Sequence, residues 1–193
     1  SEVDILEVSG SVLNVSCNGG SDGAIDLSIS GGVEPYEVEE SLENLSANLY
    51  SITAVDANGC SATTWFSISE PAILEVSVST ASVSCNGGSD GSAELTVSGG
   101  TAPYSTEDLS GLSAGTYETL VIDSNGCQAT AEFTISEVDI LEVSGSVLNV
   151  SCNSGSDGAI DLSISGGVEP YEVDGGLDGL SVGTYSITAV DAN

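Results

Sequence analysis

The chain has 193 residues, of which 30 are Asp or Glu and none is Lys, Arg or His, so its formal net charge is −30 at pH 7. Nucleic acid is excluded as a partner, because phosphate binding needs Lys or Arg. Hydrophobic residues make up 40% of the chain, which distinguishes it from disordered acidic sequences. No run of about 18 apolar residues occurs, so we expect no membrane insertion.

The sequence is dominated by three copies of one pattern. The run Val-Ser-Cys-Asn-Gly-Gly-Ser-Asp-Gly at 15–23 returns at 83–91 and, with one change, at 150–158. Residues 1–58 align without a gap on residues 136–193, whereas the middle copy is more divergent. Self-similarity at a fixed period of about 67 residues predicts a tandem array. We expect repeats at 1–68, 69–135 and 136–193, the last one truncated before its second cysteine.

Alternating apolar and polar residues predict strands within each repeat. In the middle repeat they fall at 74–79, 93–98, 116–122 and 127–135, with Gly- and Asn-rich turns at 86–91 and 123–126. The pattern predicts six or seven short strands per repeat. The expected fold is therefore all-β, a tandem array of small Greek-key (Ig-like) β-sandwich repeats. Because only Ser-Glu-Pro or a similar segment separates the repeats, we expect the array to be rod-like.

One tyrosine in each repeat follows a Leu-x-x-Gly-x-Tyr run or a close variant of it. This run is similar to the tyrosine corner of Greek-key sandwiches, in which the hydroxyl bonds to upstream backbone. The prediction is a structural role for Tyr50, Tyr117 and Tyr185.

The five cysteines suggest an oxidising compartment. Each complete repeat has two of them, which predicts disulfides within a repeat: Cys17 with Cys60, and Cys85 with Cys127. The partner of Cys152 would fall at position 195. Closing such a loop of about 42 residues stabilises a small module by roughly 4 kcal/mol. The alternatives are reduced buried cysteines or a loosely apposed pair, whereas catalytic or metal-binding cysteine is disfavoured because the chain has no Cys-x-x-Cys and no His.

Acidic and amide side chains recur in the two turns of each repeat. If the cysteines pair within a repeat, both turns lie at one end of the module, and their oxygens could bind Ca²⁺, a hard cation that takes six to eight oxygen ligands. The alternative is ordinary turn chemistry, in which Asp and Asn bond to their own backbone. The candidate ligands are Asp22, Asp56, Asn58, Asp90, Asp123, Asn125, Asp157 and Asp191.

Enzymatic activity is not expected. The chain lacks the His or Lys that would activate a serine nucleophile. Paired carboxylates can cleave glycosides, but most acidic residues here occupy outward-facing strand positions. Trp65 could stack on a sugar, but the middle repeat has no counterpart, so we favour a packing role.

The repeat resembles the SprB-type repeat of large cell-surface adhesins of gliding Bacteroidetes. The matching segments are 83–91, 98–104, 107–117, 123–127 and 134–137. The resemblance implies export by a type IX secretion system, an extracellular location on the cell surface, and roles in adhesion and gliding motility. The chain departs from the family after Tyr36, Tyr104 and Tyr171, where the segment that follows is shorter.

These observations predict the stalk of a secreted adhesin, which would project a tip domain from the cell. Its partners would be other domains of the same long chain and, through adhesion, a polysaccharide or another surface. The alternatives are repeated weak carbohydrate-binding modules, which gain avidity from repetition, and a subunit of a polymeric surface fibre.

Overall fold

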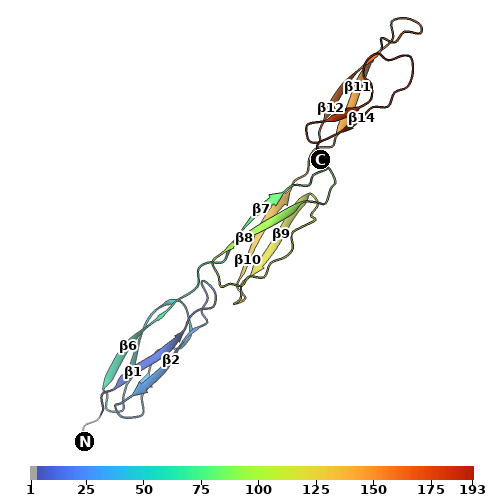
Figure 1. The fold of residues 1–193 in the computed structure, drawn as a ribbon. Helices are drawn as coiled ribbons and strands as arrows, with labels where there is room; N and C mark the ends of the chain where they lie inside the picture. Colours follow the sequence, from blue (N-terminus) through green and yellow to red (C-terminus); the bar gives the residue numbers. More distant parts are fainter. Residues whose placement is uncertain (1–3) are drawn as a thin grey trace. The chain divides into compact units, whose positions relative to one another are not determined.

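The computed structural model describes residues 4–193, and all the regular elements in this range are β-strands (Figure 1). The all-β prediction is confirmed. The strands are β1 (Glu7–Leu13), β2 (Gly23–Ser30), β3 (Glu37–Val38), β4 (Glu43–Leu45), β5 (Asn48–Val55), β6 (Ser61–Ile68), β7 (Glu75–Ala81), β8 (Ser92–Ser98), β9 (Gly115–Ile122), β10 (Gln128–Ile135), β11 (Glu142–Leu148), β12 (Ala159–Ser165), β13 (Glu172–Asp174) and β14 (Thr188–Val190).

The chain divides into two compact units, and the division runs through the second repeat. One unit contains the residues up to Ser77 together with 96–107 and 119–131, and the other contains 78–95, 108–118 and 132–193. Strands β7, β8, β9 and β10 each contribute residues to both units.

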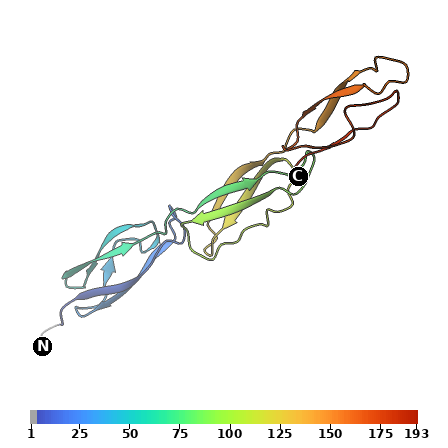
Figure 2. The ribbon, with the colours of Figure 1, turned by 45° about the horizontal axis from the view of Figure 1, so that its top comes forward.

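The first repeat is a sandwich of two antiparallel sheets, ordered β1-β2-β4 and β3-β5-β6. Strands β1 and β2 run side by side in both ribbon views (Figures 1 and 2), with Val8 opposite Ile29 and Val12 opposite Ile25. Alternation places one face of each strand inward. The buried core consists of Val15, Ile25, Leu45, Ile52, Phe66 and Ile68.

The second repeat has fewer strands than the pattern predicts. Strand β7 pairs with β8, and β9 pairs with β10, close to the predicted boundaries. The prediction of six or seven strands is correct for the first repeat but wrong for the other two, which have four each in the described range. In the second repeat the segment between β8 and β9 forms only the isolated bridges Gly91–Leu112 and Ser105–Ile122. This segment is rich in Gly, Pro and Ser, which weakens strand pairing.

The buried core of the second repeat is small. Val83, Phe133 and Ile135 are buried, and the ring of Tyr117 stacks on Phe133 at a centroid distance of 5.6 Å. In the third repeat β11 pairs with β12, and β13 pairs with β14.

Thr119 in β9 is 1% exposed, and its hydroxyl has no hydrogen-bond partner. The equivalent residue of the first repeat is Ile52, which is fully buried. A buried hydroxyl without a partner costs about 1–3 kcal/mol. We therefore expect Thr119→Val, which keeps the shape and removes the hydroxyl, to raise the free energy of unfolding by about 1–2 kcal/mol. Urea unfolding measures this. The control is Thr130→Val in β10, and a Thr119→Val protein no more stable than wild type would contradict the assignment.

Candidate functional site at the repeat junction

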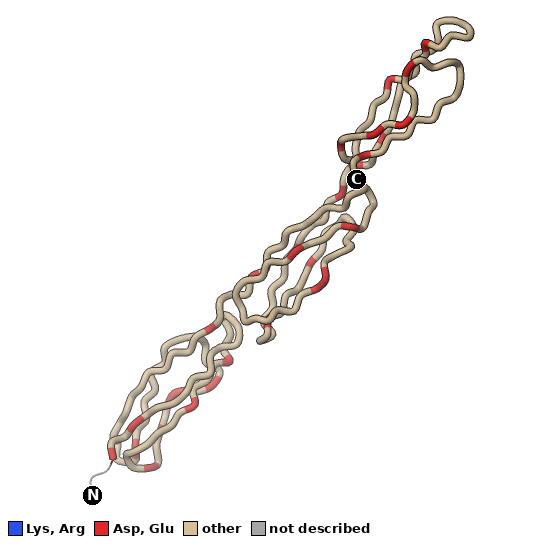
Figure 3. Tube along the Cα trace, in the orientation of Figure 1, with Lys and Arg blue, Asp and Glu red and all other residues tan. Residues whose placement is uncertain are grey.

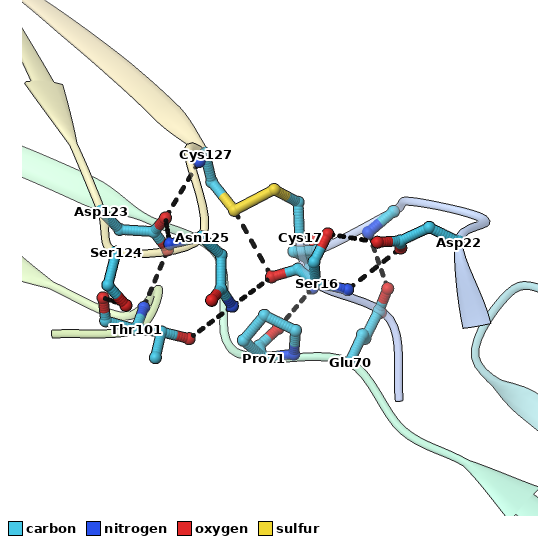
Figure 4. Close-up of a disulfide and its surroundings, with 12 residues drawn as sticks. Ser16, Cys17, Asp22, Glu70, Pro71, Thr101, Asp123, Ser124, Asn125 and Cys127 are labelled. Atoms are coloured by element: carbon cyan, nitrogen blue, oxygen red, sulfur yellow. Dashed lines mark hydrogen bonds between the residues drawn. A yellow bond between two sulfur atoms is a disulfide. The ribbon is translucent and has the colours of Figure 1, made fainter. Parts of the chain in front are cut away.

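A disulfide joins the first repeat to the second. Cys17, in the loop after β1, bonds to Cys127, which immediately precedes β10 (Figure 4). Their Cα atoms lie 5.7 Å apart, and 110 positions separate them in the sequence. Cys60, Cys85 and Cys152 are free and exposed.

The predicted pairings Cys17–Cys60 and Cys85–Cys127 are therefore wrong. Strand β2 separates the two cysteines of the first repeat. Beyond the end of β2, the N–H of Val33 donates to Asp56 of the hairpin that carries Cys60, at 3.1 Å. The start of β2 lies against the end of β6, because a Cβ on Gly23 would be 2.9 Å from Ile68. Cys17 is in the loop that leads into this start of β2. The two turns lie at opposite ends of the sandwich, so a bond within the repeat cannot form.

On one side of the disulfide, the loop of the second repeat holds the backbone of the first. The side-chain amide of Asn125 donates to the carbonyl oxygen of Ser16 at 2.9 Å and to the hydroxyl of Thr101 at 3.2 Å. Asp123 is 5% exposed and accepts the N–H groups of Thr101, Asn125 and Cys127 at 2.8–2.9 Å. These bonds shape the Asp-Ser-Asn-Gly-Cys loop that presents Cys127 (Figure 4).

On the other side, the turn that follows Cys17 is fixed to the junction segment. Asp22 accepts the N–H of Ser16 at 3.0 Å and also its hydroxyl. Glu70 accepts the N–H of Gly19 at 2.6 Å, and the amide of Asn18 donates to the carbonyl of Pro71 at 3.0 Å. The Asn-Gly turn of the first repeat thus bonds to the first residues of the second.

The same contacts recur around Cys85. Ser84 donates its N–H to Asp90 at 3.0 Å, Gly87 donates to Glu137 at 2.9 Å, and Asn86 donates to the carbonyl of Val138 at 3.0 Å. The amide of Asn193 donates to the carbonyl of Ser84, as that of Asn125 does to Ser16. The junction arrangement is therefore a property of the repeat.

Hydrogen bonds lower the pKa of the turn carboxylates. The hydroxyl and then the N–H of Ser16 lower the pKa of Asp22, and Ser84 and Ser151 do the same for Asp90 and Asp157. The N–H of Cys60, followed by those of Val33 and Asn58, lowers the pKa of Asp56 against the opposing effect of burial. Burial is the largest effect on Asp123, but the bonds from Thr101, Cys127 and Asn125 together leave its pKa lowered.

These shifts predict an acid limit to stability. A carboxylate whose pKa is lower in the folded state stabilises the fold above its unfolded pKa of about 4, and this contribution is lost as the pH falls through the folded value. We expect the urea concentration at the midpoint of unfolding to decrease once the pH is lowered below about 4. The measurement is made at high salt so that charge repulsion is screened.

Asp56→Asn should lose part of this pH dependence, whereas the control Asp26→Asn, on the exposed face of β2, should keep it. An identical pH profile for all three proteins would contradict the role of Asp56.

The structure does not support the predicted calcium site. Acidic residues are spread over all the repeats (Figure 3), and residues 4–193 contain no group of three or more acidic, Cys or His side chains placed to hold a metal ion. Asp22 lies by Cys17, whereas Asp56 and Asn58 lie at the far end of the first sandwich. Asp191 accepts the N–H groups of Val168 and Asn193. Turn chemistry accounts for these side chains, and the pairing on which convergence depended is absent.

Added salt should nevertheless stabilise the protein, because its charge of −30 has no basic side chain to balance it. Self-repulsion destabilises the compact state and is screened by ions. We expect the melting temperature to rise with NaCl, and CaCl₂ to add nothing beyond NaCl of equal ionic strength. Saturable stabilisation by micromolar Ca²⁺, reversed by EDTA, would contradict this expectation.

The hydroxyls of the three predicted structural tyrosines bond to upstream backbone. Tyr50, Tyr117 and Tyr185 donate to the carbonyls of Ser46, Ser113 and Ser181 at 2.9–3.0 Å. A second set of tyrosine hydrogen bonds was not predicted. Tyr36, Tyr104 and Tyr171 donate to the carbonyls of Gly31, Gly99 and Gly166 at 2.7 Å. The Gly-Gly-x-x-Pro-Tyr spacing shared by the repeats was the available signal.

Comparison with known proteins identifies the repeat. The SprB repeat family matches residues 9–37, 77–105 and 144–172, one segment in each repeat. Comparisons with curated proteins and with solved structures found no match. Between residues 4 and 193 there is no helix of the length and apolarity needed to cross a membrane. SprB repeats belong to cell-surface proteins, and three segments of this chain match the repeat, which points to an adhesin-like repeat region.

Proposed function

We propose that this chain is the stalk of a secreted cell-surface adhesin, which spaces other domains from the cell and transmits tension in adhesion and gliding motility. The observation that carries the proposal is the Cys17–Cys127 disulfide, which connects one repeat covalently to the next. A binding module needs no covalent bond to its neighbour, whereas a stalk under tension gains resistance to extension from one. The short junctions in the sequence also favour a stalk over modules on flexible linkers.

Small-angle scattering of the three-repeat protein tests the spacing role. A compact globule of this length would have a radius of gyration of about 16 Å. We expect a clearly larger value that rises with each repeat added. A value near that of a globule would refute the stalk.

Carbohydrate binding is the second candidate, and the exposure of Trp65 favours it. The indole is 63% exposed on the outer face of β6, near Leu49, which is 57% exposed. Exposed aromatic faces stack on apolar ligand surfaces. However, Glu132 occupies the equivalent position in the second repeat, so the second repeat would add no stacking and no avidity to that of the first.

A glycan array separates the two candidates. The stalk should bind no glycan, with or without the single tryptophan. Binding that is lost in Trp65→Ala, and is accompanied by a change in tryptophan fluorescence in wild type, would support the carbohydrate-binding module instead.

A further inference from the structure

The junction disulfide connects two particular strands. Cys17 follows the end of β1 by four residues, and Cys127 lies directly before the start of β10. Strand β1 is the first strand of the first repeat, and β10 is the last strand of the second. A covalent path from the N-terminus through the two sulfur atoms to the third repeat therefore contains only these two strands.

The other strands of the two repeats lie outside this path. Residues 18–126 contain β2 to β9 and form the loop that the disulfide closes. The core residues Ile25, Leu45 and Ile52 of the first repeat belong to this loop, as does Val83 of the second. The loop is attached to the path only through the two bonded cysteines, so tension along the path does not pass through these strands.

The two strands on the path are already close to their full length. A strand rises about 3.2–3.4 Å per residue, and a fully extended chain spans at most about 3.3–3.6 Å per residue. The seven residues of β1 and the eight residues of β10 therefore lengthen very little under tension. Both ends of each strand lie on the path, so tension acts along the strand without sliding it past its neighbour in the sheet.

Reduction of the disulfide changes the path that the load takes. Without the sulfur bridge, the covalent path runs through every strand from β1 to β10. Strands β1 and β2 are antiparallel, with Glu7 opposite Ser30 at one end and Leu13 opposite Ala24 at the other. The reduced first repeat can unravel only when this ladder opens and its core is exposed. The stability of the sandwich therefore resists extension only in the reduced protein.

We propose that the Cys17–Cys127 bond is a redox-sensitive switch of extensibility. In the oxidised protein, β1, the two sulfur atoms and β10 form one load-bearing line, and the other strands of both sandwiches carry no load. In the reduced protein the load passes through both sandwiches, which open and lengthen. The biological use of the switch rests on the role in transmitting tension proposed above, whereas the switch itself is a property of the two repeats.

The switching step is a thiol–disulfide exchange with an external dithiol as reductant. One thiolate of the dithiol attacks a sulfur atom of the bond and releases the other cysteine as a thiolate, which leaves a mixed disulfide. The second thiol of the reductant displaces the remaining cysteine, so two electrons and two protons pass from the dithiol to Cys17 and Cys127. Both cysteines are partly exposed, so a small reductant has access to the bond in the folded protein.

Force spectroscopy on the full chain tests the switch. One handle is attached to the N-terminus and the other to an azide-bearing residue in place of Asp139, so that the third repeat lies outside the pulled segment. The oxidised protein should show no unfolding step at any force that leaves its covalent bonds intact. With a dithiol present, unfolding steps of the first two repeats should appear. Unfolding steps in the oxidised protein would overturn the switch, whereas a compact globule in the scattering experiment would refute the stalk alone.

A core variant shows whether the sandwich carries load. Leu45→Ala truncates a core side chain outside the load-bearing line. In the reduced protein it should make the first repeat open about tenfold faster at a fixed force, because core truncation destabilises the fold. In the oxidised protein it should leave the force–extension curve unchanged.

Two further variants complete this test. If Leu45→Ala prevents folding, Ile52→Val is the milder change, with an expected acceleration of about two- to fivefold in the reduced protein. Cys17→Ser is the control and should behave as the reduced protein with or without dithiol. An oxidised core variant that lengthens more readily than oxidised wild type would contradict the proposal, as would oxidised and reduced wild-type proteins with the same force–extension curve.

Discussion

Pulled from its two ends, the oxidised protein should extend by about 360–400 Å less than the reduced protein. The disulfide closes a loop of 110 positions, and an extended chain spans about 3.3–3.6 Å per residue. Tension entering near the N-terminus passes through the sulfur atoms from Cys17 to Cys127, so the residues between them bear no load. More than half of the 193 residues are shielded in this way.

Single-molecule force spectroscopy with and without reductant measures this length. The control is Cys17→Ser, whose total contour length should not depend on reductant. A bond between Cys17 and Cys60 would close a loop of only 43 positions and hide about 140–155 Å. Release of the shorter length would contradict the junction disulfide, and no release at all would show that the bond does not form.

The strands of the repeat could be predicted from local pattern alone. Alternation in 93–98 and 116–122 predicted β8 and β9 to within one residue at each end, and the Asn-Gly loop at 123–126 predicted the turn before β10. Such signals are local, because the period of a strand and the chemistry of a turn depend only on neighbouring residues.

The cysteine pairing could not be predicted in this way, because a repeated sequence leaves it ambiguous by one period. Cys60 and Cys127 occupy the same position in successive repeats, so either is an equally good partner for Cys17 by pattern. What decides between them is how often the chain crosses the sandwich. Strands β3 and β4 have only 2 and 3 residues, lie in different sheets and together make one crossing. If β3 and β4 are each counted as a full crossing, Cys60 is placed at the same end of the sandwich as Cys17, which is not where the structure has it.

The convergence of side chains that the calcium prediction assumed is absent for the same reason. The prediction assumed that Asp22 and Asp56 share one end of the module, and the crossing made by β3 and β4 separates them. The junction contacts of Glu70 and Asn125 were equally hidden, since they join residues 51 and 109 positions apart. Nothing in local pattern distinguishes a turn residue that bonds its own loop from one that bonds a neighbouring repeat.

Replacing either partner of the junction disulfide should strongly destabilise the protein. In the chain-entropy model, a closed loop of this length stabilises the fold by about 4–5 kcal/mol, because it restricts the unfolded chain. We expect Cys17→Ser and Cys127→Ser to lower the free energy of unfolding by that amount. The double variant should lose no more than either single one, since all three lack the same bond.

Cys60→Ser is the matched control, because Cys60 is exposed and free. It should change stability by less than about 0.5 kcal/mol, as surface substitutions usually do. Urea unfolding is followed by the fluorescence of Trp65, which reports on the first repeat. This repeat contains Cys17 and Cys60, and the disulfide partner of Cys17 is Cys127 of the second repeat. Bonding within the repeat predicts the opposite result, in which Cys60→Ser is as damaging as Cys17→Ser and Cys127→Ser leaves the Trp65 transition unchanged. The three variants therefore decide whether the disulfide lies within a repeat or between neighbouring repeats. Only a disulfide between repeats gives the array covalent continuity across the junction.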